Sequence, residues 1–141
     1  MSDRDNVRLI EEAYSAFGRG DVQAVLDALT PDVEWTIPGP REVKICGVRR
    51  GHAQVGEFFR DLAEAEEIEQ FEPRDFIASG DKVVAIGHYR SKIRATGATA
   101  DMDWVHVFTF RSGKVASFRE FTDSLAVAEA YGVRPATAAA R

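Results

Sequence analysis

The chain has 141 residues, of which 45% are hydrophobic and 29% charged, and its formal net charge is −5. These values are ordinary for one globular domain that is large enough to bury a sizeable core. The negative charge argues against nucleic-acid binding, which needs a basic patch, and no stretch approaches the length of a membrane span.

Helical spacing dominates the first half of the chain. The first helix is predicted to begin at Ser2 or Asp3, either of which can cap it, and to end at Gly18. Its apolar residues recur at helical spacing: Val7, Ile10, Tyr14 and Phe17. Asp21 caps a second, shorter helix, and a third is predicted over residues 51–65.

The segments around the third helix are less regular. Alternation predicts a short strand over residues 33–37, and a loop with one short strand around 43–45 follows it. The acidic run EAEEIEQ, residues 64–70, is predicted to be a solvated helix end or a loop.

The second half of the chain changes to a period of two. This alternation predicts four strands, over residues 71–78, 83–94, 102–110 and 115–123. Turns at 79–82, 95–100 and 111–114 join them into hairpins, and Gly113 is free to take a positive φ. Pro73 favours an edge position for the first of these strands, and Gly87 marks a bulge or a bend.

The end of the chain reads as a short helix over residues 124–131, stopped by Gly132. Residues 135–141 have the composition of a frayed tail, so we expect one domain over residues 1–134. Helices first and hairpins afterwards predict an α+β fold, in which N-terminal helices pack on a strongly bent, mostly antiparallel sheet. Such a cone-shaped α+β barrel has an open mouth, where ligand pockets lie.

Both faces of the strand over residues 102–110 are apolar, including Val105 and Val107. The helices can cover only one face of the sheet. We therefore expect a homodimer that forms through the outer face.

One face of the same strand carries the candidate chemistry. Trp104, His106 and Phe108 alternate along it, and the neighbouring strand ends in Asp123. Aromatic side chains with an imidazole and a carboxylate predict the wall of a small apolar pocket with two proton-handling groups.

Location and metal content follow from simpler features. The charged start MSDRDNVRLI lacks the apolar segment of a signal peptide, and the single cysteine, Cys46, has no partner for an internal disulfide. We therefore expect a cytoplasmic protein. The three histidines show no metal-ligand spacing, so no metal and no cofactor is expected.

A series of short motifs runs in order through nearly the whole chain: Phe17-Gly18-Arg19-Gly20-Asp21, Pro31-Asp32-Val33-Glu34-Trp35, Gly47 and Gly51 before Phe58-Phe59, Gly80-Asp81-Lys82-Val83-Val84, Thr96-Gly97, Trp104-Val105-His106, Gly113-Lys114-Val115, and Phe118-Arg119-Glu120-Phe121-Thr122-Asp123. Together they resemble the nuclear-transport-factor-2-like superfamily, and within it the SnoaL-like polyketide cyclases. This fold hosts isomerases, dehydratases, cyclases, epoxide hydrolases and non-enzymatic binding domains.

The resemblance assigns roles to two residues. Asp123 falls where SnoaL-like cyclases keep an active-site aspartate. His106 falls where ketosteroid isomerases carry the acid that donates to the oxyanion, and where SnoaL-like members often carry histidine. The resemblance therefore implies that these two residues are the catalytic pair.

The chain also departs from the pattern of these families. The catalytic tyrosine of the isomerases would align with Ala13, not with Tyr14, and their general base with Ile37. The arginine and second aspartate of limonene-type epoxide hydrolases would align near Gly87 and Tyr89. Both of those activities therefore lose essential groups, whereas an acid/base use of Asp123 and His106 survives.

Each candidate residue also has a purely structural interpretation. Asp123 can cap the last helix, His106 can be a satisfied core histidine, and Tyr14 is predicted to be a core residue with a satisfied hydroxyl. The candidate ligand-binding residues can equally belong to the core: Trp35, Phe59, Tyr89, Trp104 and Phe108.

Two functions are therefore predicted. One is a cofactor-independent acid/base enzyme of the cyclase, isomerase or dehydratase type, which acts on a small hydrophobic molecule that bears a carbonyl group. The other is a non-catalytic domain on the same scaffold that binds a small ligand or a protein partner.

Overall fold

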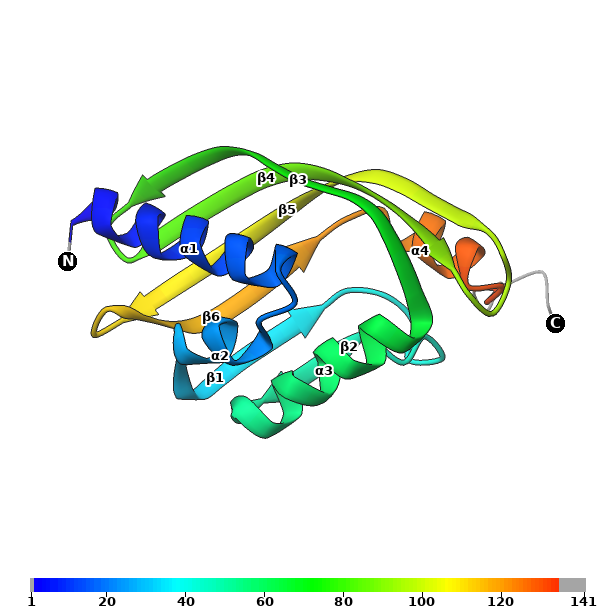
Figure 1. Ribbon diagram of the computed structural model, residues 1–141, viewed down its shortest axis with the longest axis horizontal. Coiled ribbons are helices and arrows are strands. Elements are labelled where there is room, and N and C mark those ends of the chain that lie inside the picture. The colour runs from blue at the N-terminus through cyan, green and yellow to red at the C-terminus, as the bar shows by residue number, and fades with distance from the viewer. Residues whose placement is uncertain (1, 135–141) are drawn as a thin grey trace, which may run out of the picture.

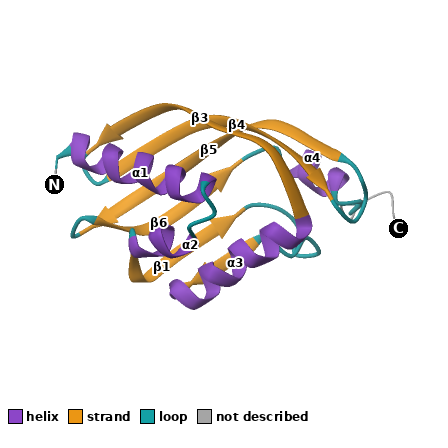
Figure 2. Cartoon of the chain, viewed as in Figure 1, coloured by secondary structure: helices purple, strands orange, loops and turns teal. Residues whose placement is uncertain are grey.

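One six-stranded sheet organises the computed structural model, which describes residues 2–134 (Figure 1). The strands lie in the order β2-β1-β6-β5-β4-β3, and only β1 and β6 pair in parallel. Their bounds are β1 Leu29–Ile37, β2 Gly47–Arg50, β3 Glu66–Ser79, β4 Lys82–Ile93, β5 Thr99–Arg111 and β6 Lys114–Phe121. The sheet curves strongly and stays open between its edge strands β2 and β3 (Figure 2).

Three helices cover the inner face of this sheet: α1 (Asp3–Gly18), α2 (Val22–Asp27) and α3 (Gly51–Ala65). α1 lies against β3 and β4, and α3 lies against β1 and β2. The fourth helix, α4 (Ser124–Ala130), lies near the opposite end of the sheet from the N-terminus (Figure 1). The predicted α+β fold with helices on a bent, mostly antiparallel sheet is confirmed, whereas the predicted tail 135–141 lies outside the described residues.

The ends of these elements follow local hydrogen-bonding rules. α1 begins with a capping box, in which the Ser2 hydroxyl accepts from the Asp5 amide at 3.1 Å and the Asp5 carboxylate accepts from the Ser2 amide at 3.3 Å. The turn between β5 and β6 has positive φ at both central residues, 51° at Ser112 and 81° at Gly113. These angles match the right-handed twist of a two-residue hairpin, so the predicted turn is confirmed.

Two predictions for the irregular segments are wrong. The acidic run forms strand from Glu66 onward, because β3 is an edge strand whose exposed side chains need no apolar alternation. The strand expected around residues 43–45 is absent: Val43 and Ile45 are buried in a turn segment, and β2 begins at Gly47 instead.

Gly87 lets two parts of the sheet approach closely. A Cβ atom there would lie 2.3 Å from both Trp104 Cζ2 and the Glu72 carbonyl oxygen. The pairing of β3 with β4 also shifts register next to it, between Pro73 and Asp75. The predicted irregularity at Gly87 is therefore confirmed, and its role is to seat the Trp104 indole against the sheet.

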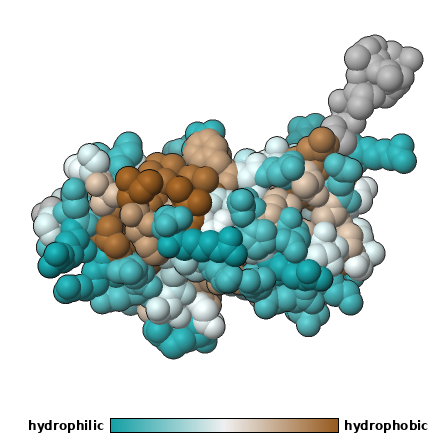
Figure 3. Space-filling view, turned by 90° about the horizontal axis from the view of Figure 1, so that it is seen from above, coloured by the Kyte–Doolittle hydropathy of each residue, from teal (hydrophilic) through white to brown (hydrophobic). Residues whose placement is uncertain are grey.

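The outer face of the sheet carries apolar side chains without helical cover. Ile77, 58% exposed, pairs with Val84 on β4, which pairs with Val107 on β5. Ile86 and Val105 form the next apolar pair along the same strands. Seen from above, the molecule shows a hydrophobic patch in its left half, surrounded by hydrophilic residues (Figure 3).

None of the helices in residues 2–134 combines the length and the hydrophobicity that crossing a membrane requires.

Candidate functional site

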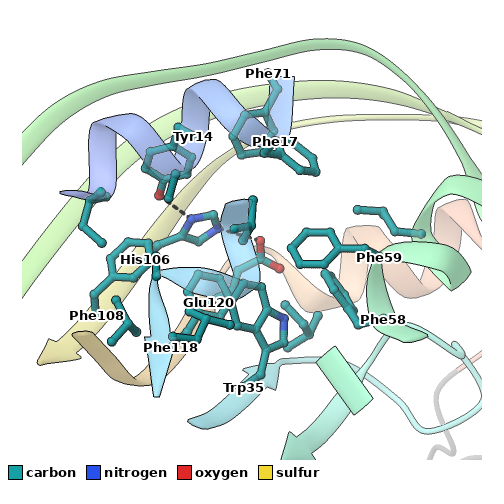
Figure 4. A pocket seen from close by; sticks show the side chains of 18 residues that line it. Tyr14, Phe17, Trp35, Phe58, Phe59, Phe71, His106, Phe108, Phe118 and Glu120 are labelled. Atoms are coloured by element: carbon teal, nitrogen blue, oxygen red, sulfur yellow. Dashed lines mark hydrogen bonds and ion pairs between the residues drawn. The ribbon is translucent and has the colours of Figure 1, made fainter. Parts of the chain in front are cut away.

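The helices and the inner face of the sheet enclose a cavity of about 100 Å³ (Figure 4). Aromatic and aliphatic side chains from α1, α2, α3 and four strands form its wall. Apart from the Trp35 indole nitrogen, its polar atoms come from three side chains: Tyr14, His106 and Glu120. The remaining lining residues are Ile10, Ala13, Phe17, Val25, Ala28, Leu29, Trp35, Ile37, Phe58, Phe59, Leu62, Phe71, Phe108, Val115 and Phe118.

The three polar side chains form one hydrogen-bonded chain. The Tyr14 hydroxyl lies 2.7 Å from His106 Nδ1, and His106 Nε2 lies 2.9 Å from Glu120 Oε1. Figure 4 shows the three groups side by side, with the imidazole between the phenol and the carboxylate. Within the described residues, Glu120 Oε2 has no hydrogen-bond partner, so one carboxylate oxygen is left for a ligand.

Aromatic rings hold the imidazole in place. The Trp104 ring stacks on it with a centroid distance of 4.0 Å, and Phe118 meets it edge-on at 4.7 Å. His106 is only 4% exposed, so water does not compete for its ring nitrogens. Burial, aided by the negative charge of Glu120, raises the pKa of Tyr14 far above its ordinary value of 10.0. The phenol therefore stays protonated and acts as a hydrogen-bond donor.

Two proton arrangements satisfy this chain. With a neutral imidazole, Nε2–H donates to the Glu120 carboxylate, and the Tyr14 hydroxyl donates to Nδ1. With an imidazolium, both ring nitrogens donate, and the Tyr14 hydrogen is released toward another acceptor. Protonation of His106 therefore converts Tyr14 into a donor that can serve a ligand.

Glu120 was missed by sequence reasoning because of one irregularity in the hairpin. The turn pairs Arg111 with Lys114, and an unbroken ladder from there would place Arg119 opposite His106. A bulge between Thr109 and Phe110 shifts the register by one residue, so that Glu120 lies opposite His106 and faces inward. No residue type at the bulge marks it in the sequence.

Four of the residues predicted for the site line the cavity: His106, Trp35, Phe59 and Phe108. Trp104 does not line it, and supports the imidazole from behind.

Tyr89 is also absent from the cavity wall, and is half-buried between the two hydrophobic clusters of the core.

Ala13 and Ile37, the positions aligned with the isomerases' tyrosine and base, both line the cavity without a polar group. The hydroxyl comes from Tyr14 instead, and it is satisfied as expected, by His106.

Asp123 lies apart from this chain of groups. It is the exposed N-cap of α4, and its Oδ1 accepts from the Ala126 amide at 2.9 Å. It does not line the cavity. The structure therefore does not bring Asp123 and His106 together, and the group that it brings to His106 is Glu120.

The other two histidines make separate contacts. His52 Nε2 lies 3.0 Å from the Leu29 carbonyl oxygen. His88, on the outer face, is clamped between Asp103 at 2.7 Å and Asp101 at 2.5 Å, and Arg90 also contacts Asp101. Across residues 2–134, no three His, Cys, Asp or Glu side chains gather as a metal site would need.

The fold and the site define a member of the nuclear-transport-factor-2-like superfamily, in which a curved sheet and helices enclose one apolar pocket. The sequence model of the SnoaL-like domain family matches residues 10–118, and the chain belongs to that family.

Solved structures of similar proteins support this assignment. An NTF2-like protein from Burkholderia xenovorans is 37% identical with a TM-score of 0.84, over 92% of this chain and 98% of that one. TerC, co-crystallised with polyporic acid, is 31% identical with a TM-score of 0.81, over 91% and 98%. An uncharacterised protein of Mycobacterium tuberculosis is 26% identical over 131 residues, which cover 93% of this chain and 98% of that protein.

Proposed function

We propose that this protein is a cofactor-independent acid/base enzyme, of the isomerase, dehydratase or cyclase type, that acts on a small hydrophobic molecule with a carbonyl group. The observation that carries this proposal is the Tyr14–His106–Glu120 chain, which ends in a free carboxylate oxygen at the wall of an apolar cavity. A hydrogen-bonded chain of side chains with only a structural role would not need to reach the cavity surface.

The reaction would begin with proton abstraction. Glu120 Oε2 takes a proton from the carbon next to the carbonyl, the C–H electron pair forms a C=C bond, and the carbonyl oxygen becomes an enolate. With His106 protonated, the Tyr14 hydroxyl donates to that oxygen and stabilises its charge. Return of the proton from Glu120 to another carbon, as the carbonyl re-forms, completes an isomerisation. Transfer of that proton to a hydroxyl group on the next carbon, which leaves as water, instead gives a dehydration.

The size of the cavity supports a ring-shaped ligand. An engineered apolar cavity of about 150 Å³ binds benzene, so a cavity of similar scale suits roughly one ring. The relative TerC was co-crystallised with a small organic molecule, polyporic acid. We therefore place the substrate among small cyclic ketones and related carbonyl compounds.

Deuterium exchange tests the shared first step without knowledge of the true substrate. In D2O, the protein should accelerate hydrogen–deuterium exchange at the carbon next to the carbonyl of cyclohexanone, followed by NMR. Glu120→Gln should lower the enzyme-dependent rate by about 10²–10⁴-fold, because it removes the base and keeps the shape.

Asp123→Asn is the matched control, since its carboxylate caps α4 at the surface. It should leave the exchange rate unchanged and lower only the melting temperature. Exchange no faster than in buffer would favour the alternative of a non-catalytic binding domain, and loss of exchange in Asp123→Asn alone would restore Asp123 as the base.

We also propose that the protein is a homodimer through the outer face of the sheet. The apolar pairs of β4 and β5 and the exposed Ile77 lie there without helical cover. Ile77→Lys should then shift the mass measured by light scattering at micromolar concentration from dimer to monomer. A monomeric wild-type protein would rule the dimer out. A cytoplasmic location stays a prediction, supported by the single cysteine.

A further inference from the structure

The smallest side chains of the cavity wall lie between α1 and α2. Among the residues that line the cavity, the only alanines are Ala13 on α1 and Ala28, just after α2. Every other lining side chain is valine or larger. At this point the wall is therefore formed by two methyl groups, one from Ala13 and one from Ala28.

A groove of about 530 Å³ lies on the other side of the same wall, and Ala13 and Ala28 line it as well. Its floor is made of other apolar side chains from the two helices, Leu9, Ala16 and Ala24. Two separate hollows thus share two alanines, and the groove faces the cavity across them.

The rim of the groove differs from its floor. Ser15, Arg19 and Asp27 bring polar groups to the rim, where the groove meets water. A molecule with an apolar ring and one polar substituent can lay the ring on the alanine floor and keep the substituent at the rim. This is the chemistry of the ligands proposed for the cavity.

The other walls of the cavity would be harder to open for a ligand. On the sheet side, separating strands would break several backbone hydrogen bonds between β1, β6 and β5. On the α3 side, Phe58 and Phe59 pack edge-to-face against each other and against Trp35. Moving Ala28 away from α1 separates methyl groups and breaks one backbone hydrogen bond to the sheet, from the Val115 amide to the Ala28 carbonyl oxygen.

We infer that small cyclic ligands reach the cavity through the groove between α1 and α2, by displacement of the Ala13–Ala28 wall. This inference rests on the proposed function only in that it takes the cavity as the ligand site. It assigns a role to a groove that the proton-transfer chain does not touch.

Stopped-flow binding of 4-nitrophenol tests the route. This single-ring phenol absorbs where tryptophan emits, so it should quench the fluorescence of Trp35 in the cavity wall. Ala24→Phe fills the groove at a position that does not line the cavity. Both the association and the dissociation rate constants should fall by the same factor, on the order of tenfold, with Kd unchanged.

A second variant and a control keep the result interpretable. Ser15→Phe blocks the groove from an exposed position on α1, so it does not depend on repacking of the core. Glu11→Phe places the same side chain on α1 at an exposed position outside the groove and should change neither rate constant. Melting curves should confirm that all three variants are folded before their rate constants are compared.

The outcomes separate the two proposals. If folded Ala24→Phe and Ser15→Phe both bind at wild-type rates, the ligand enters elsewhere and the inferred route is wrong. If Kd rises while the association rate constant stays constant, the groove is part of the final binding site, which also overturns the route. A wild-type protein that shows no quenching contradicts the cavity as a ligand site, and with it the proposed function.

Discussion

Removal of the Tyr14 hydroxyl is the simplest perturbation of the buried polar chain. Tyr14→Phe breaks the 2.7 Å hydrogen bond and leaves Nδ1 of His106, a residue only 4% exposed, without its partner. A buried polar atom that loses its partner costs about 1–3 kcal/mol. For a domain of this size, we expect the melting temperature to fall by about 3–10 °C.

The same variant should weaken the proposed chemistry. Loss of a donor to a developing oxyanion costs about 10²–10³-fold in rate, so deuterium exchange into cyclohexanone should fall by that factor. Binding of 4-nitrophenol should weaken less than the exchange rate, because the aromatic wall stays intact.

A double-mutant cycle shows whether the three groups act as one unit. Tyr14 and Glu120 bond to opposite nitrogens of one imidazole, so each bond polarises the other. Urea unfolding of Tyr14→Phe, Glu120→Gln and the double variant at pH 7 should give a coupling free energy of about 0.5 kcal/mol or more. Additivity within about 0.3 kcal/mol would refute the cooperative chain.

Two further predictions concern the sheet. Gly87→Ala should lower the free energy of unfolding by about 1–3 kcal/mol, because its Cβ would overlap the Trp104 ring. Gly56→Ala should not, because its Cβ would lie at an ordinary contact distance of 3.8 Å from Leu26 Cδ1; urea unfolding compares the two variants. Hydrogen bonds to Asp103 and Asp101, of which the bond to Asp103 has the larger effect, raise the pKa of His88 above its ordinary value of 6.5. Its stabilising contribution is therefore complete below pH 6.5 and is lost as the pH rises through the raised pKa; Asp103→Asn should lower that pKa in an NMR titration, and an unchanged value would contradict the clamp.

The periodicity of apolar residues predicted those helices and strands in which one face is buried and the other is exposed to solvent. The helices and the hairpin strands carry such patterns, and Trp35, His106 and Phe108 fall on the inner face as alternation requires. The first part of β3 was not predicted as a strand, because Glu67 and Glu69 are exposed on this edge strand and the sequence there shows no apolar alternation. The strand misplaced around residues 43–45 shows that a short apolar run can be buried without being a strand.

Site residues were predicted from the sequence only where a local sequence pattern marks them. His106 stands among aromatic residues on a regular strand, and that pattern is visible in the sequence. Glu120 depends on a bulge that changes the pairing of a whole hairpin, which is a tertiary property. Asp123, beside Ser124 at a helix start, fits equally a cap and a catalytic aspartate in sequence, and only the structure shows the cap.

A second buried carboxylate, that of Glu66, tests how strongly burial in the protein interior disfavours the charged form. It is 6% exposed at the start of β3, and its carboxylate accepts from the hydroxyl of Tyr131, at the end of α4. Burial raises the pKa of Glu66 above its ordinary value of 4.5, although the Tyr131 hydrogen bond opposes that rise. A raised folded-state pKa means that the group stabilises the fold fully below pH 4.5 and loses this contribution as the pH rises through the raised value. Glu66→Gln keeps an oxygen for Tyr131 and cannot ionise, so from pH 4 to pH 7 its melting temperature should gain on that of the wild type. Wild-type and variant curves that stay parallel over this range would show that the Glu66 carboxylate is as well solvated when folded as when unfolded.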